Sequence, residues 1–393
     1  MSDDDIVILS GARTAIGGFG GSLAAVTPIQ LATFVTKAAV ERAGLTPDQI
    51  GTVVFGHVIN TEPRDMYLSR VAMLDAGIPD TTPAMNVNRL CGSGAQAIVS
   101  AVQALRLGDA DFAVAGGAES MSRAPYASTT ARFGAKMGDT QMLDMMVGAL
   151  TCPMGTGHMG VTAENVATET SITRKDQDDF ALESQNRAAK AIAEGRFKDQ
   201  IVPVEIKTRK GMVAFDTDEH PKATDADKLA GLRPAFVKDG TVTAGNASGI
   251  NDGAAAVVLA RAGAAKQAGL APRFKVLGYA VAGVPPRVMG NGPIPAVKKL
   301  LEQTGLSVGD FDVIESNEAF AAQAIAVNRG LGLDPAKVNP NGGAIALGHP
   351  VGATGAILTV KAMYELDRIN GKKALITMCI GGGQGIALAI ERI

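Results

Sequence analysis

Short runs of β-branched and aromatic residues alternate along most of the chain with longer segments whose apolar residues recur at helical spacing. The short runs predict strands at Ile6–Leu9, Thr52–Phe55, Phe112–Ala115, Val257–Leu259, Phe274–Leu277, Val313–Ile314 and Leu375–Met378. The longer segments predict helices at Ile29–Ala43, Ala95–Leu107, Ile294–Thr304, Ala319–Leu331 and Ala353–Ile369. This alternation is typical of α/β proteins, in which crossover connections cover a buried sheet.

The two ends of the chain repeat one order of landmarks, which predicts an internal duplication. A strand follows a Gly-Leu helix end in both places, and the start of a later helix and a Gly pair at a strand end recur as well. The matched positions lie 260 to 265 residues apart and are Val53 and Val313, Gly44 and Gly305, Gly94 and Gly355, and Gly116 and Gly381. Chance agreement between short apolar strings is the alternative.

The stretch from about Glu119 to Asn246 differs from both copies, because it is rich in Met, Arg and polar residues. Patterns at Thr162–Glu169 and Lys175–Glu194 predict helices of its own, and Thr173 is expected to cap the second of them. A connection of this length with its own elements is usually functional, so we expect a functional insertion here.

Composition and charge exclude several classes of protein. A chain of 393 residues with 46% hydrophobic residues can bury a large core, and its net charge of -2 offers no basic field for nucleic acid. No apolar run approaches the ~20 residues that span a bilayer, and the acidic start Met1–Asp5 is unlike a leader peptide. The 3 Cys and 4 His show neither disulfide pairing nor ligand spacing. We therefore expect a cytoplasmic protein with no membrane contact, no metal and no disulfide framework.

The first candidate for chemistry is Cys91, within the segment Asn88–Gly94. It lies between a short strand-like stretch, Ala84–Val87, and the helix that starts near Ala95. A thiol at a strand-to-helix turn is near the positive end of the helix dipole, which favours the thiolate. The neighbouring Gly residues leave room for a substrate. A buried, unreactive Cys is the alternative.

Three further candidates come from the second half of the chain. His349 stands between a Gly and a Pro before a helix, either as the base for a thiol or as a turn residue. Cys379 ends a strand, and the Gly run from Gly381 onward exposes N–H groups that can form an oxyanion hole or an anion nest. Asn317 follows a strand, either as a helix cap or as a hydrogen-bond donor to a developing charge.

Taken together, these segments resemble the thiolases, specifically the acetyl-CoA acetyltransferases and related β-ketothiolases. The likeness covers essentially the whole chain in order, and it rests on Gly11–Gly17, Asn88–Gly94, Gly116–Ser122, Thr243–Gly249, Asn317–Phe320, Gly348–Pro350 and Cys379–Gly383. The segment Thr61–Tyr67 is most similar to the bacterial β-ketothiolases that accept acyl chains beyond acetyl.

The resemblance implies an α/β fold, a duplicated five-layered αβαβα sandwich with an inserted loop domain. It divides the chain into an N-terminal half with Cys91, a CoA-binding loop domain and a C-terminal half with His349 and Cys379, at residues 1–120 plus 247–270, 121–246 and 271–393. Members are usually homotetramers, built as dimers of dimers, and sometimes dimers. Thr129–Asp144 lies where tetrameric bacterial members carry their assembly loop.

The resemblance also implies roles for the candidate residues. Cys91 would attack an acyl-CoA and hold the acyl group as a thioester, after His349 has taken its proton to make a thiolate. Cys379 would remove a proton from the methyl group of a second acetyl-CoA, and the enolate would attack the acyl-enzyme. His349 and a water held by Asn317 would stabilise the enolate, and the N–H groups of Cys91 and Gly381 the tetrahedral intermediate.

For CoA, the positions that match the family's binding residues are His158, Ala235, Phe236, Ala244, Ser248, Met289, Ala319 and Phe320. Many relatives carry an Arg-His pair in the loop that contacts the nucleotide, whereas Asp218–Thr224 of this chain is shorter and lacks that Arg. Lys222 is the cation that can replace it as a point charge. Ala149–Gly157, next to the expected acyl pocket, is also unlike the family, and we assign no role to Cys152 within it.

The predicted function is the reversible condensation of acetyl-CoA with acetyl-CoA or a short-chain acyl-CoA, with CoA thioesters as substrates and no permanently bound cofactor. The alternatives are a degradative 3-ketoacyl-CoA thiolase of β-oxidation, a condensing enzyme of the same fold that uses an acyl-carrier protein, and a catalytically retired acyl-CoA-binding homologue. The pair Cys91 and Cys379 disfavours the second alternative. The intact set that also includes Asn317 and His349 disfavours the third.

Overall fold

The computed structural model describes residues 1–209 and 211–393, and its core is a large mixed sheet. The strands of this sheet are β1 (Ile6–Thr14), β2 (Gly17–Gly18), β3 (Thr52–Gly56), β4 (Ala84–Val87), β5 (Phe112–Ser120), β10 (Ile201–Val202), β13 (Asn251–Arg261), β14 (Phe274–Gly283), β15 (Val313–Ser316), β16 (Lys373–Ile380) and β17 (Gln384–Arg392). They follow the order β15-β16-β17-β14-β1-β13-β5-β3-β4, with β10 beside β1 and β2 beside β13.

The sheet consists of two halves of the same design. In the first half, β5 lies between parallel β3 and antiparallel β13. In the second half, β16 lies in the same way between parallel β15 and antiparallel β17. The halves join where β1 pairs antiparallel with β14, through Val7–Lys275 and Ile8–Phe274. The strand order therefore confirms the duplication that the sequence predicts.

One landmark of the predicted duplication is wrong in register. The corresponding pairs of strands meet at Thr52–Ala113 in the first half and at Val313–Ala374 in the second. The hydrogen bonds from the Gly51 N–H to the Phe112 carbonyl and from the Asp312 N–H to the Lys373 carbonyl are equivalent at the same offset of 261, so Gly116 matches Thr377 rather than Gly381. The Gly pairs differ because they stand at different points along their strands. The same offset places Glu119 at the position of Ile380, next to Cys379.

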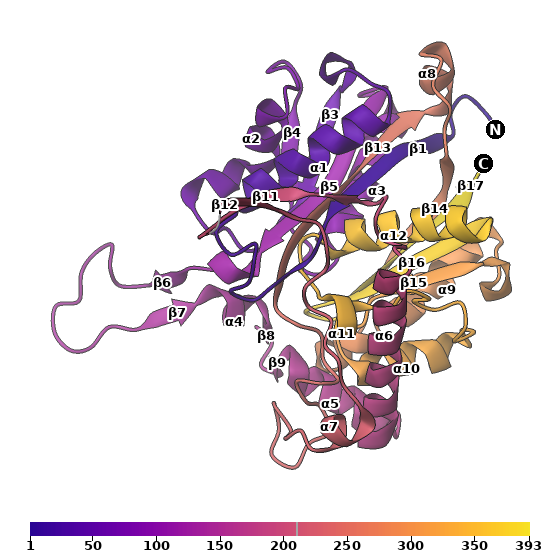
Figure 1. Ribbon diagram of the computed structural model, residues 1–393. Helices are drawn as coiled ribbons and strands as arrows, with labels where there is room; N and C mark the ends of the chain where they lie inside the picture. The colour runs from indigo at the N-terminus through magenta and orange to yellow at the C-terminus, as the bar shows by residue number, and fades with distance from the viewer. Residues whose placement is uncertain (210) are drawn as a thin grey trace.

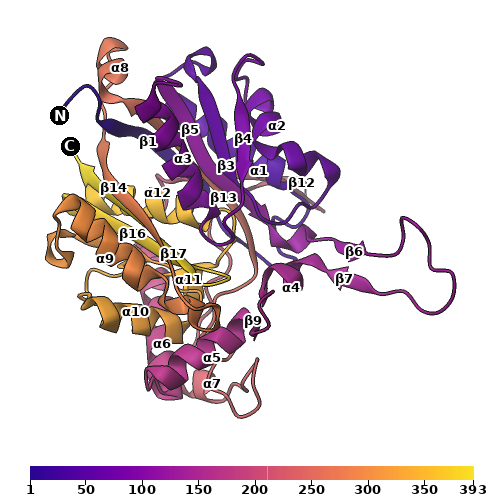
Figure 2. The ribbon, with the colours of Figure 1, turned by 180° about the vertical axis from the view of Figure 1, so that it is seen from behind.

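Helices form three layers around the two sheet halves (Figure 1, Figure 2). They are α1 (Pro28–Arg42), α2 (Leu68–Asp75), α3 (Ser93–Leu107), α9 (Pro293–Thr304), α10 (Ala321–Leu331) and α12 (Thr354–Ile369). Strand β1 shows the layering, because the Ser10 hydroxyl donates to the Ala39 carbonyl of α1 while Gly11 faces Val360 of α12. The order is α1/α2, sheet, α3/α12, sheet, α9/α10, which is the five-layered arrangement expected.

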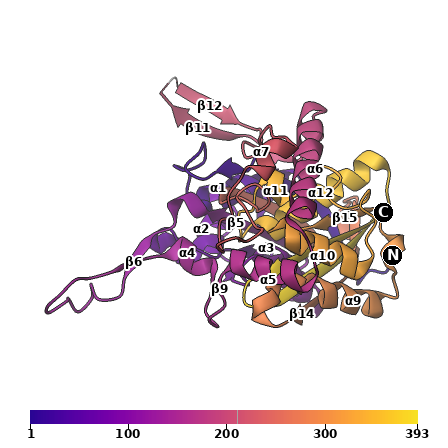
Figure 3. The same ribbon diagram turned by 90° about the horizontal axis from the view of Figure 1, so that it is seen from below.

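A long insertion follows β5 and folds largely apart from the sheet (Figure 3). It contains β6 (Tyr126–Ser128), β7 (Met142–Asp144), α4 (Met145–Ala149), β8 (Thr151–Cys152), β9 (Gly157–His158), α5 (Met159–Glu169), α6 (Arg174–Ala193), β11 (Val204–Thr208), β12 (Gly211–Phe215) and α7 (Ala226–Ala230). The hairpin β6–β7 extends far from the body of the molecule. Thr173 caps α6 by accepting the N–H of Asp176, as predicted.

The predicted strands all lie inside observed strands, and the predicted helices match observed ones to within about two residues except α5, which begins at Met159. The sequence misses β17, whose Gly- and Ala-containing run lacks the β-branched alternation of a strand. It also misses α2, α8 (Ala262–Gln267) and α11 (Ala344–Leu347), which are too short for a clear helical period. Within the described ranges, no helix has the length and apolar content needed to cross a membrane.

Candidate active site

Cys91 occupies the tight turn between β4 and α3, as the sequence predicts. The turn is closed by Ser93, whose hydroxyl oxygen accepts the N–H of Arg89 at 2.8 Å and donates to the carbonyl of Leu90 at 2.7 Å. Leu90 has a φ of 46°, in the left-handed region that a side chain seldom adopts. Helix α3 then starts at Ser93, so the half-buried Cys91 lies next to its N-terminus.

His349 is buried, and a hydrogen bond reaches each of its polar groups. Its backbone N–H donates to Asn251 Oδ1 at 2.9 Å, its Nδ1 lies 2.7 Å from Thr354 Oγ1, and its Nε2 lies 3.4 Å from Asn317 Nδ2. The Thr354 hydroxyl donates to the carbonyl of Pro350 at 2.9 Å, so its oxygen is the acceptor toward the ring. The proton of the neutral ring is therefore on Nδ1, so Nε2 accepts the long hydrogen bond from Asn317 and is the nitrogen that can take up a proton.

Cys379 lies near the carboxyl end of β16 and is fully buried. Two residues later, the backbone N–H of Gly381 donates a hydrogen bond to the sulfur of Cys91. A Cβ on Gly381 would lie 3.2 Å from the Leu90 side chain, so glycine permits this close approach. The thiols of the two halves thus meet at one point.

Burial dominates the electrostatics of these three groups. It lowers the pKa of His349 to about 4 and raises the pKa of Cys379, to which the neighbouring Cys91 adds. Burial also raises the pKa of Cys91, against the opposing N–H groups of Gly381 and of Cys91 itself. Burial therefore opposes the effect of the helix N-terminus, which favours the thiolate of Cys91.

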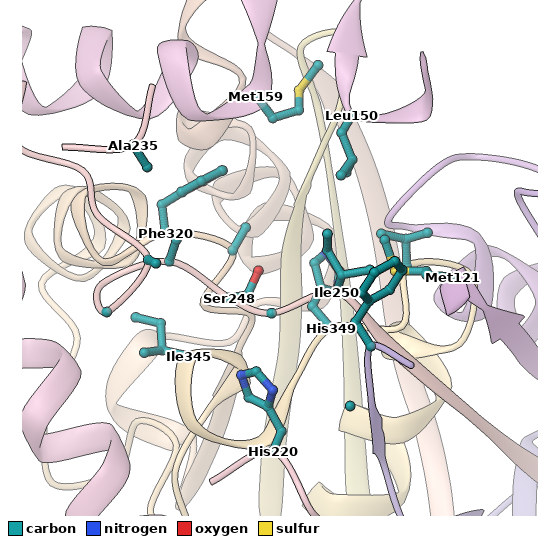
Figure 4. Close-up of a pocket in the computed structure, with 18 of the residues that line it drawn as sticks. Met121, Leu150, Met159, His220, Ala235, Ser248, Ile250, Phe320, Ile345 and His349 are labelled. Carbon is teal, nitrogen blue, oxygen red and sulfur yellow. The ribbon is translucent and has the colours of Figure 1, made fainter. Parts of the chain in front are cut away.

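A cavity of about 830 Å³ opens onto these groups and is lined by Cys91, His349 and Cys379. All positions predicted for CoA line the same cavity, namely His158, Lys222, Ala235, Phe236, Ala244, Ser248, Met289, Ala319 and Phe320. Asn317 and Gly381 stand behind the lining and contact His349 and Cys91. Figure 4 shows Met121 and Ile250 beside His349, and Ala235 at the opposite end. The structure thus gathers every predicted site residue around one space.

One wall of the cavity is built from stacked rings. His158 stacks on Phe236 with ring centroids 4.8 Å apart, and Phe236 meets Phe320 edge to face at 6.0 Å. The N–H of Ser248 donates to the carbonyl of Ala319 at 3.0 Å, which ties the loop before β13 to the start of α10. His158 Nδ1 accepts the N–H that caps α5, so its Nε2 is the nitrogen available to a ligand.

The loop that carries Lys222 is anchored from the core. Arg13 of β1 forms a buried, bidentate pair with Asp218, at 2.7 and 2.9 Å. The N–H of Lys222 donates to Gln185 Oε1 of α6 at 3.0 Å. A shortened loop held in this way presents one exposed cation at the cavity wall, next to His220.

Sequence reasoning misses the apolar end of the cavity. Its lining there includes Met121, Leu150, Met159, Ile250 and Val351. Leu150 belongs to the segment that departs from the family pattern, and Met121 belongs to the motif Gly116–Ser122. The other side chains are scattered along the chain without a shared period. Cys152 packs in one apolar cluster with Met159 and Cys379, but it is not part of the cavity lining.

No set of three or more His, Cys, Asp and Glu side chains in the described part of the chain is arranged to hold a metal ion. The groups around the cavity are two thiols, an imidazole, an amide and backbone N–H groups, and they enclose an apolar space. Such a set suits acyl transfer through a thioester, with an oxyanion bound by N–H donors.

Comparisons with known proteins match the whole chain. Family models described as the thiolase N-terminal and C-terminal domains match residues 6–263 and 270–392. The beta-ketothiolase BktB of Cupriavidus necator is 60% identical over 391 residues, 99% of both chains. The acetyl-CoA acetyltransferase of Thiocystis violacea is 50% identical over 99% of this chain and all of its own.

Two solved structures have nearly the same fold. The Bacillus anthracis acetyl-CoA acetyltransferase superposes with a TM-score of 0.97 at 47% identity, over 99% of both chains. A human mitochondrial 3-ketoacyl-CoA thiolase in complex with CoA superposes with a TM-score of 0.96 at 43% identity, over 99% of this chain and 98% of its own.

Proposed function

The chain belongs to the thiolase family, and from this premise we propose that it is an acyltransferase for CoA thioesters. It catalyses the reversible Claisen condensation of acetyl-CoA with acetyl-CoA or a short-chain acyl-CoA, to give a 3-ketoacyl-CoA and CoA. The observation that carries this proposal is the meeting of Cys91 and Cys379, one from each half, beside His349 in one cavity. An acyl-CoA binder needs no such pair.

In the first half-reaction, the Cys91 sulfur attacks the thioester carbon of an acyl-CoA. Because the resting groups are a thiol and a neutral imidazole, the Cys91 proton moves to His349 Nε2 as the new C–S bond forms. The N–H groups of Cys91 and Gly381, which face the sulfur, bind the oxyanion of the tetrahedral intermediate. CoA then leaves as a thiolate and takes the proton from His349.

In the second half-reaction, Cys379 passes its proton to His349 Nε2, and its thiolate removes a proton from the methyl group of acetyl-CoA. The imidazolium then donates to the enolate oxygen, and Asn317 lies 3.4 Å from the same nitrogen. Among the described residues, no group donates a hydrogen bond to the carbonyl oxygen of the Asn317 side chain, and this oxygen can bind a water. The enolate carbon attacks the acyl thioester, and the Cys91 sulfur leaves as a thiolate. His349 gives its proton to Cys91, and Cys379 keeps the proton that it took from the methyl group.

For CoA, we assign the stacked wall of His158, Phe236 and Phe320 to the pantetheine arm and Lys222 to the nucleotide phosphates. The wall is supported by its ring stacking and its place along the cavity. Lys222 supplies a point charge but no planar partner for a base, so phosphate contacts rather than ring stacking are expected there. No permanently bound cofactor enters this scheme.

We also propose a homotetramer, a dimer of dimers, in the cytoplasm. The β6–β7 hairpin exposes Phe133 and Met137 by 91% and 96% of their surfaces, which favours burial against another copy. The two reacting thiols must stay reduced, which suits the cytoplasm. The mass of the native particle in solution tests the assembly, and a monomer would refute it.

The test of the function is thiolysis. The purified protein, given acetoacetyl-CoA and CoA, should produce two molecules of acetyl-CoA, detected by chromatography. CoA binding without cleavage would refute the proposal and leave the retired binder. A series of 3-ketoacyl-CoA substrates from acetoacetyl to decanoyl length, compared by kcat/KM, then separates the short-chain enzyme from the degradative alternative.

A further inference from the structure

The duplicated fold places a buried carboxylate, Glu119, where the second half has an apolar side chain. At the offset of 261 shown by equivalent hydrogen bonds between strands, Glu119 corresponds to Ile380. The central helices α3 and α12 start at Ser93 and Thr354, which is also an offset of 261. At that offset, Gly352 corresponds to Cys91.

Glu119 and Gly352 are in contact across the two halves. Glu119 is fully buried, and its Oε2 accepts the N–H of Gly352 at 2.9 Å and that of Val58 at 3.1 Å. Its Oε1 accepts the N–H of Ile59 at 3.1 Å and lies 3.4 Å from His57 Nδ1. Val58 and Ile59 belong to the first half and Gly352 to the second, so one carboxylate bridges the two halves.

Gly352 lies inside the segment that holds His349 and Thr354, where the backbone is closely packed against its neighbours. A Cβ on Gly352 would lie 2.5 Å from Glu119 Oε2. A Cβ on Gly117 of β5 would lie 2.2 Å from the Gly352 carbonyl oxygen. Since backbone meets backbone here, a shift of Gly352 cannot be absorbed by side chains and would move His349.

We propose that Glu119 is a positioning residue, whose carboxylate fixes the segment His349–Thr354 against the half that carries Cys91. It thereby sets the geometry between the Cys91 sulfur and His349 Nε2, and this role rests on the proposed thiolase function. The negative charge of Glu119 does not by itself favour the reaction. It raises the pKa of Cys91 and so disfavours the thiolate nucleophile.

Two substitutions of Glu119 distinguish a positioning role from an effect of its charge. Glu119→Gln keeps the length but leaves one acceptor oxygen for three N–H groups, and Glu119→Asp keeps the charge but is too short to hold both halves. We expect kcat for thiolysis to fall by about 10- to 100-fold in both, with KM for CoA unchanged. Alkylation of Cys91 by iodoacetamide should slow in both, although loss of charge alone would speed it in Glu119→Gln.

Glu164 of α5 offers a matched control. Its carboxylate also accepts backbone N–H groups, from Thr241 and Val242 at 2.8 Å, but within the insertion and away from His349. Glu164→Gln should keep both kcat and the alkylation rate of Cys91. A melting curve establishes that each variant is folded at the assay temperature.

The outcomes are distinct. If the wild-type protein fails to cleave acetoacetyl-CoA, the function is wrong. If the wild type is active and the folded Glu119 variants match it, or if Glu119→Gln is alkylated faster at wild-type kcat, only the positioning role is overturned. Should neither variant fold, hydrogen exchange of the wild-type enzyme decides: a protected Gly352 amide supports the bridge, and rapid exchange overturns it.

Discussion

The ends of β5 and β16 occupy matching places in the two halves of the sheet, yet they hold opposite chemistry. At the end of β5, Glu119 has N–H donors from both halves around its oxygens. At the end of β16, Cys379 packs in an apolar cluster with Met159, Met289 and Phe320, and its own N–H is the donor near its sulfur. Glu119 corresponds to Ile380, the neighbour of Cys379, so adjacent positions at the two strand ends hold a bridge in one half and a reactive group in the other.

The hydroxyl residues at the starts of α3 and α12 also differ in what they bind. The Ser93 hydroxyl at the start of α3 bonds only to backbone groups of its own turn, at Arg89 and Leu90. The Thr354 hydroxyl at the start of α12 bonds to a backbone carbonyl and also to His349. In the first half the hydroxyl shapes a loop, and in the second it orients a base. Reactive groups from the two halves then share one cavity.

The largest effect should come from removing the reactive side chain of the first half. Cys91→Ser should lower kcat for thiolysis by ~10⁴-fold or more, because a hydroxyl of much higher pKa replaces the thiol. Steady-state assay with acetoacetyl-CoA measures the loss, and calorimetry should show CoA binding retained. Wild-type turnover in this variant would exclude Cys91 as the nucleophile.

Removing the thiol at the end of β16 should affect one half-reaction alone. Cys379→Ser should slow exchange of the acetyl α-hydrogens of acetyl-CoA with deuterated water by ~10³-fold, since a proton-transfer group contributes ~10²–10⁴. Acylation of Cys91, followed by intact-protein mass, should persist. Undiminished exchange would contradict the divided roles of the two thiols.

The Thr354 hydroxyl at the start of α12 should affect catalysis, although its counterpart Ser93 in α3 only shapes a loop. Thr354→Val removes the acceptor for His349 Nδ1–H, so the ring can adopt the wrong tautomer, and kcat should fall by ~10- to 100-fold. Thr354→Ser keeps the oxygen and should stay near the wild type. Equal rates for the Val and Ser variants would show that the hydroxyl does not orient the ring.

The smallest effect concerns pH. Because burial lowers the pKa of His349 to about 4, its Nε2 is unprotonated at neutral pH and becomes protonated only as pH falls through that value. The acid limb of kcat/KM, which reports the free enzyme, should therefore lie below about pH 5 rather than near ~6.5. Between pH 6 and 7 the change should stay below about twofold. An acid limb near an ordinary His pKa would contradict the buried, neutral base.

Much of the fold could be read from local patterns. The strand around Val53 and the cap at Thr173 follow from side-chain period and hydrogen-bonding capacity, which act over a few residues. The match of Gly116 to Gly381 failed because equivalence in a sheet is decided by register, and register is a long-range pairing. β17 was missed because its neighbours, rather than its own composition, make it a strand.

The sequence by itself determined the thiolase family, the two-copy plan and the identity of Cys91, Asn317, His349 and Cys379 as candidates. Only the tertiary structure decided that these groups meet in one cavity, that burial raises the pKa of both thiols and that Glu119 bridges the halves. The reason is physical: residue types and spacings are local, whereas burial, pKa and contacts between residues more than 200 positions apart arise only when distant segments exclude water together.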